Sequence, residues 1–211
     1  MAGIAKDSVA EFKTRVLRFD QRYVEDWNSW LNVLPQNRPE VMGIILRRWQ
    51  ACRPNRMRRT SNESKHAAPF LENLLQAAEP HVETLRTFDI RSIGSFTLDA
   101  CNALNELWSI FENLSHYGRA RGGRAGVVGI SKAVLLLTDG RVGPAFDSKV
   151  RSHLGVGNIV NSEEWVNALR VASEDIFKFE FANQTTINLS VPEFANLFGG
   201  RIYDMALGPG A

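Results

Sequence analysis

Apolar residues recur at intervals of three and four along most of this chain, and this spacing places them on one face of an α-helix. The pattern predicts helices over Asp7 to about Leu34, 39–51, 69–88, 97–117, 131–138, 147–154, 162–179 and 192–198. Pro80 is expected to break or kink the third of these helices, because proline removes a helix hydrogen bond. A short strand over 181–189 and a glycine-rich tail after residue 198 complete the expected elements.

These elements predict a mainly α fold without a persuasive sheet or an internal repeat. Residues 1–211 are expected to form a single α-helical domain of several packed helices. An arrangement of two helical lobes around segment 124–155 would also fit the pattern. Segment 53–66 is polar and basic and contains Pro54 and Asn55. It is therefore expected to be a loop, either ordered or disordered.

The composition is that of an ordinary globular protein, with 44% hydrophobic and 23% charged residues. Two distant cysteines, Cys52 and Cys101, argue against a disulfide framework and against an iron–sulfur cluster. The four histidines lack metal-ligand spacing, so neither a metal nor a cofactor is expected. No apolar run reaches the length of a membrane span or a signal peptide, which favours a cytoplasmic protein. The oligomeric state is left open.

The charges are distributed unevenly although the net charge is only +2. Segment 47–65 carries seven basic residues against the single acid Glu63, and segment 119–151 carries seven against Asp139 and Asp147. These segments sum to +6 and +5, so the rest of the chain sums to −9. Two basic segments on an acidic body are typical of a phosphate-binding face, although arginines also occur simply because they keep loops hydrated.

Segment 124–155 combines several chemically useful features. Gly126 and Gly129 precede an apolar helix that has Lys132 near its start, and a short loop then leads to Asp147 at the head of another helix. A glycine lets the main chain approach another surface closely, and free amides at a helix start bind phosphate. We therefore expect the amides of Ile130, Ser131 and Lys132, with the Ser131 hydroxyl, to form a seat for one phosphate.

The same segment resembles the helix-hairpin-helix DNA glycosylase superfamily. Residues 127–133 lie along the Gly-Val-Gly-x-Lys-Thr-Ala part of the hairpin signature of that family, and residues 146–151 lie along its Val-Asp-Thr-His-Val-x-Arg turn. Ser131 occupies the column of the lysine of the family, and Lys132 follows one place later. The resemblance covers residues 124–155 only.

The resemblance implies a DNA-repair hydrolase that removes a flipped base from DNA. Asp147 would then be the catalytic carboxylate that stabilises the positive charge developing on the sugar, and Lys132 would be a weaker catalytic candidate. The side chains expected to grip phosphates are those of Arg121, Arg124 and Lys149. DNA is the implied partner, and no membrane or iron–sulfur cluster is implied.

Plainer interpretations compete with each of these roles. Asp147 also fits the N-cap of the helix that follows it, and Lys132 also fits an exposed or phosphate-contacting lysine. The alternative function is a non-catalytic helical binding or scaffold protein that retains only the helix-hairpin-helix architecture.

Overall fold

The computed structural model describes residues 3–116 and 123–210, and this part of the chain is almost entirely helical. The α-helices of this part are α1 (Val9–Leu17), α2 (Gln21–Leu31), α3 (Arg38–Arg48), α4 (Leu71–Thr84), α5 (Leu98–Phe111), α6 (Val127–Leu137), α7 (Ser148–Leu154), α8 (Ser162–Asn183), α9 (Ile187–Ser190) and α10 (Gly199–Leu207). Short 3₁₀ turns occupy Pro35–Asn37, Leu85–Thr87, Ile93–Ser95, Glu112–Leu114 and Pro192–Phe194. Within the described ranges there is no strand beyond one isolated bridge, so the predicted mainly α fold is confirmed.

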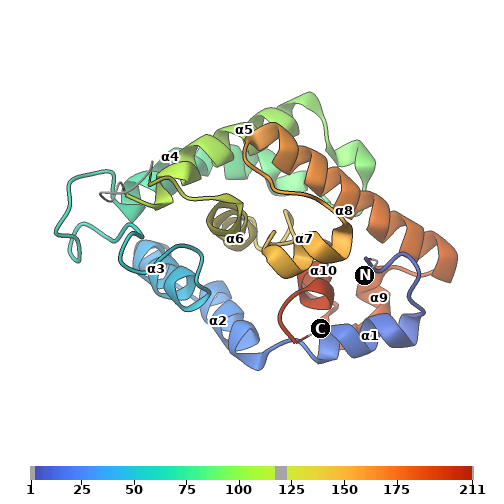
Figure 1. The fold of residues 1–211 in the computed structure, drawn as a ribbon. Coiled ribbons are helices and arrows are strands. Elements are labelled where there is room, and N and C mark those ends of the chain that lie inside the picture. Colours follow the sequence, from blue (N-terminus) through green and yellow to red (C-terminus); the bar gives the residue numbers. More distant parts are fainter. Residues whose placement is uncertain (1–2, 117–122, 211) are drawn as a thin grey trace.

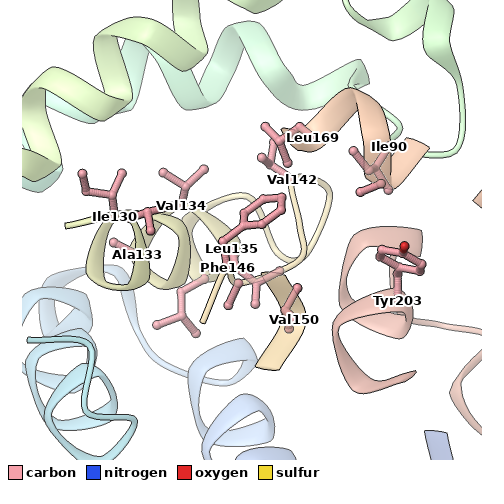
Figure 2. Close-up of a cluster of buried hydrophobic side chains, with 14 of the residues drawn as sticks. Ile90, Ile130, Ala133, Val134, Leu135, Val142, Phe146, Val150, Leu169 and Tyr203 are labelled. Carbon is pink, nitrogen blue, oxygen red and sulfur yellow. The ribbon is translucent and has the colours of Figure 1, made fainter. Parts of the chain in front are cut away.

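Helix α6 lies in the middle of the molecule, with α3, α5 and α7 around it (Figure 1). Nine of its eleven residues are buried, because its apolar residues surround the helix axis and do not form a single stripe. Figure 2 shows Ile130, Val134 and Leu135 of α6 in the same cluster as Phe146, which precedes α7. The buried cluster contains residues from every helix, and the fold is compact.

The first predicted helix is in fact two. Ser8, not Asp7, caps α1 through a capping box with Glu11. The chain then turns at Arg18, and the Asp20 carboxylate accepts a hydrogen bond from the Arg22 amide to start α2. A local capping residue therefore overrides a continuous apolar pattern.

Pro80 does not break α4, which continues through it to Thr84. A proline removes only its own amide hydrogen bond, and the helix packs against both α3 and α5. The predicted strand over 181–189 is also wrong, because α8 extends to Asn183 and α9 follows at Ile187.

The expected glycine-rich tail is instead the buried helix α10, which packs against α1. A Cβ on Gly200 would come within 2.6 Å of the carbonyl oxygen of Gly140, so this glycine permits the two main chains to touch. The Arg201 amide then donates a hydrogen bond to that same carbonyl at 3.0 Å. The glycines here allow close packing and do not mark an open chain end.

Among the described residues, none of the helices combines the length and the apolar character that crossing a bilayer requires.

Candidate nucleic-acid interface

Segment 53–66 is ordered against the end of the α5 region and is not a free loop. Met57 pairs with Ser115 in the isolated antiparallel bridge, the Arg58 amide donates to the Leu114 carbonyl, and the His116 amide donates to the Arg56 carbonyl. The bridge holds the first basic segment against residues 114–116. The sequence shows the charge of this segment but gives no sign of this contact.

Two neighbouring hollows open along this junction. The first, of about 210 Å³, is lined by Cys52, Arg53, Arg56, Ser115 and residues 123–126. The second, of about 390 Å³, is lined mainly by Arg58, Arg59, Glu63, Lys65, His66 and His116. Six basic side chains and one acid line the two hollows, and we call these six the basic face: Arg53, Arg56, Arg58, Arg59, Lys65 and Arg124.

Two histidines in the second hollow lie ring to ring. The rings of His66 and His116 have centroids 4.1 Å apart. They join the second hollow to the segment that carries the bridge, since His116 directly follows Ser115. Sequence reasoning missed both of these residues as members of the site, because the contact is between segments far apart in the chain.

Gly126 is the N-cap of α6 and lies at the edge of the first hollow. A Cβ added to it would meet nothing within 4 Å, so the space before the helix is open. The amides of Val127 and Val128 begin the helix and have no acceptor within it. This end of α6 therefore presents the positive end of a helix dipole toward the hollow.

The predicted phosphate seat at residues 130–132 is wrong in its position. Helix α6 begins four residues earlier than expected, so the Ile130 amide is already bonded to the Gly126 carbonyl at 3.2 Å. Ile130, Ser131 and Lys132 are all buried. Gly129 is equally internal, because a Cβ there would lie 2.8 Å from the Ala51 carbonyl oxygen.

Ser131 joins two elements of the core. Its hydroxyl donates to the Val127 carbonyl at 2.6 Å and accepts a hydrogen bond from the Phe146 amide at 2.9 Å. Only 2% of the residue is exposed. The hydroxyl therefore holds the loop before α7 against α6 and does not face solvent.

Lys132 is not the exposed lysine that the sequence favoured. The residue is 7% exposed, and its ammonium group donates a hydrogen bond to the Trp49 carbonyl. Burial lowers the pKa of Lys132, while Asp147, Asp204 and Cys52 partly oppose the shift. The amine is thus held in the interior by the Trp49 carbonyl.

Asp147 is the N-cap of α7, as the plainer interpretation of the sequence predicts. One carboxylate oxygen, Oδ1, accepts a hydrogen bond from the Val150 amide at 2.9 Å. The side chain is half-buried, and its charge also acts on Tyr23, whose ring lies 5.4 Å from that of Trp49. Burial is the main reason that the pKa of Tyr23 is raised.

The other three residues that were predicted to contact phosphate lie in different places. Arg124 belongs to the basic face and pairs with Glu112 at 2.8 Å while its side chain remains 61% exposed. Lys149 donates to the Gly208 carbonyl at 3.1 Å and so ties α7 to the end of α10. Arg121 lies outside the described residues.

Comparisons with known proteins give no relative. No family model, no curated protein and no solved structure matches this chain.

Proposed function

We propose that this protein binds nucleic acid through the basic face. The observation that carries the proposal is the bridge between Met57 and Ser115, which holds the basic segment 53–66 beside Arg124, so that one surface has six basic side chains and a single acid. The six basic side chains and Glu63 sum to +5 and the rest of the chain sums to −3, so positive charge is concentrated at this surface. Such a surface attracts a polyanion by releasing its counterions.

The groups available at the basic face suit a phosphate backbone better than a base edge. Arginine makes bidentate contacts to phosphate oxygens, and an open helix start adds main-chain donors and a favourable dipole. Phosphate contacts hold a protein on nucleic acid without selecting a sequence. We therefore expect binding that depends strongly on salt and weakly on sequence.

The test is a fluorescence anisotropy titration of the full chain with a short labelled DNA duplex over a range of salt concentrations. The variant Arg53→Ala/Arg56→Ala/Arg124→Ala removes three charges from the first hollow. A matched control, Arg22→Ala/Arg86→Ala/Lys178→Ala, removes three exposed charges outside both hollows.

We expect the wild type to bind more weakly as salt rises. The slope of log K against log salt should fall by about 0.9 for each phosphate contact that the first variant loses. The control variant should keep the wild-type slope. Failure of the wild type to bind duplex at low salt, or equal losses in both variants, would contradict the proposal and favour a scaffold role without nucleic acid.

A second candidate function is base excision, which the resemblance of segment 124–155 to DNA glycosylases implies. Its support is the hydrogen bond from the Phe146 amide to Ser131, which holds Asp147 at the start of α7 beside the part of α6 that carries the buried amine of Lys132. A carboxylate in this setting can stabilise a positively charged sugar in the transition state.

Cys52 and Cys101 are both free, which agrees with a cytoplasmic setting for either function.

The variant Asp147→Asn tests this second function without removing the helix cap, because asparagine caps as well as aspartate. Base release would be measured on a panel of duplexes with single damaged bases, beside the DNA affinity of the same variant. Loss of release with retained affinity supports a catalytic carboxylate. Equal release from both proteins, or none from the wild type on any duplex, leaves Asp147 as a cap only.

A further inference from the structure

A cavity of about 240 Å³ opens between the segment that follows α4, the turn that follows α6 and the start of α10. Its charged lining residues are Arg91, Arg141 and Asp89, and the rings of Phe88 and Phe198 supply an apolar part of the wall. The cavity shares no lining residue with the two hollows of the basic face. It is therefore a separate feature of the surface.

The guanidinium group of Arg141 is stacked on the ring of Phe198. Its central carbon lies 3.7 Å from the ring centroid. A guanidinium so close to a ring lies roughly parallel to it, because an upright one would push an N–H group into the ring. The five N–H donors lie in the guanidinium plane, so they point past the ring and not into it.

These N–H groups of Arg141 are unpaired and open to solvent. Within residues 3–116 and 123–210, no hydrogen bond or ion pair uses this guanidinium. The side chain is half-buried, and none of its three guanidinium nitrogens is among the buried polar atoms that lack a partner. An acceptor that enters the cavity can therefore reach them.

Arg91 adds a second cation to the cavity. Its Nε donates to the Asp89 carboxylate at 3.0 Å and its Nη2 at 2.7 Å. The remaining nitrogen, Nη1, is also absent from the buried polar atoms and makes no bond within the described chain. A Cβ on Gly199 would come within 2.9 Å of Cγ of Arg91, so the stem of this arginine lies directly on the start of α10.

The lining carries a net positive charge. Burial acts to raise the pKa of Asp89, but the hydrogen bonds from Arg91 outweigh burial, so the pKa lies below its ordinary value and the group is ionised at neutral pH. Two guanidinium groups and one carboxylate sum to +1. Glu180 of α8, whose charge also acts on Arg91, is not part of the lining. A ligand with one negative charge would balance the lining, whereas a dianion would also be repelled by Asp89.

From these contacts we infer that the cavity binds a small molecule through a single carboxylate group. The planar fork of Arg141 matches the two oxygens of a carboxylate, and both arginines favour its charge. Stacking on Phe198 already orients the fork, so less side-chain freedom is lost when the ligand binds. The site is independent of nucleic-acid binding, because none of its residues belongs to the basic face.

The experiment is an NMR titration of the ¹⁵N-labelled full chain at constant ionic strength. At about pH 6 a carboxylate is ionised and arginine Nε–H resonances can be observed. The Nε–H resonance of Arg141 is assigned by its absence in Arg141→Gln, and the Gly199 amide reports on the cavity in every variant. Acetate is the probe, acetamide is its uncharged analogue, and sulfate is a dianion.

We expect acetate to shift both resonances in a saturable way. Acetamide should bind about tenfold more weakly, because it lacks the charge and the second acceptor oxygen. Sulfate should also bind more weakly than acetate, because its second charge is not compensated. No saturable shift with acetate, equal binding of acetamide, or binding of sulfate as tight as that of acetate would each overturn the inference.

Four variants separate binding from folding. Arg141→Gln should lose the acetate shift of the Gly199 amide, and Arg141→Lys should weaken binding because it keeps the charge without the fork. Asp89→Asn removes the competing carboxylate and should tighten acetate binding, which a folding defect does not do. Arg22→Gln removes an exposed arginine outside the cavity and should bind acetate as the wild type does. Unchanged binding in Arg141→Gln, or weaker binding in Asp89→Asn, would contradict the assignment.

Discussion

Gly129 of α6 lies directly against the carbonyl oxygen of Ala51, so closely that a Cβ on the glycine would come within 2.8 Å of it. The same Cβ would lie 2.9 Å from the Cys52 sulfur. Segment 49–52 therefore lies on α6 with main chain against main chain. That contact places the Trp49 carbonyl over Lys132. Lys132 follows Gly129 by three residues, which is almost one turn of α6.

The variant Gly129→Ala should lose stability for this reason. Forcing a methyl group into a packed contact costs about 1–3 kcal/mol, and the better helix propensity of alanine returns about 0.5–1 kcal/mol. We expect a net loss of about 1–2 kcal/mol in the free energy of unfolding, measured by urea titration. Gly126→Ser is the matched control, because that position is open and serine is a good N-cap; it should change stability by a few tenths of a kcal/mol. Similar losses in both variants would contradict the contact.

A second prediction concerns the buried charge of Lys132. Burial lowers the pKa of the Lys132 amine in the folded protein below its ordinary value of 10.5, which it keeps in the unfolded chain. Between these two values the unfolded chain binds more protons, so the stability contributed by this residue rises with pH. Lys132→Met keeps the side-chain volume and removes the titration, and we expect its stability at pH 7 to lie within about 1 kcal/mol of the wild type.

The measurement is urea unfolding of both proteins at several pH values from 7 to about 10. The stability of the wild type relative to Lys132→Met should increase across this window. The charge of Lys132 acts on Cys52, but burial raises the pKa of that thiol to about 11, so the thiol stays largely protonated in both folded proteins over this window. A difference that stays flat or falls with pH would show that the amine is not desolvated in the folded state.

A third prediction concerns the reactivity of Cys52. Burial raises the pKa of its thiol to about 11, and the thiolate is the reactive form. In the variant Cys101→Ala, alkylation by iodoacetamide should accelerate about tenfold for each pH unit between 8 and 10. The same variant in denaturant serves as the control, and its alkylation rate should level off near pH 9.0, the ordinary pKa of a cysteine thiol. Levelling near that value in the folded protein would show that the thiol is open to water.

The sequence predicted the elements whose signals are local. The mainly α fold and the ends of α7 follow from apolar spacing and the Asp147 cap, and Gly155, with a positive φ of 65°, ends the helix in the structure. Helix α10 was missed because Gly199 and Gly200 suggest an open tail, whereas their lack of side chains permits contact with Arg91 and with the turn at Gly140. That function of a glycine depends on its spatial neighbour and cannot be recognised from the chain alone.

The site was predicted only in part for the same reason. The charges of both basic segments and the position of Arg124 are visible in the sequence, but the bridge that joins Met57 to Ser115 is not. The interior position of Lys132 depends on segment 49–52 covering it. A lysine near the start of an apolar helix gives no local sign of such a cover, and the lysine is therefore expected to be exposed.

The last prediction concerns the buried ion pair of α10, in which Arg201 and Asp204 are 1% and 5% exposed. Removing one member leaves the other charge buried without its partner, so Arg201→Met should cost about 3–5 kcal/mol. The double variant Arg201→Met/Asp204→Asn should recover part of this loss, because an asparagine oxygen can still accept from the Ala145 amide. Urea unfolding of the two variants, the wild type and Asp204→Asn completes a double-mutant cycle.

The pH dependence of this cycle has a definite sign. Burial already raises the pKa of Asp204, and the positive charge of Arg201 opposes that shift. Without Arg201 the folded-state pKa of Asp204 rises further, so the folded variant takes up a proton that the unfolded chain does not. The stability deficit of Arg201→Met relative to the wild type should therefore shrink as pH falls from 7 toward 4. A deficit that is constant over this range, or a double variant as unstable as the single one, would show that Arg201 stabilises the fold by packing over Trp27 and Phe19 and not by its charge.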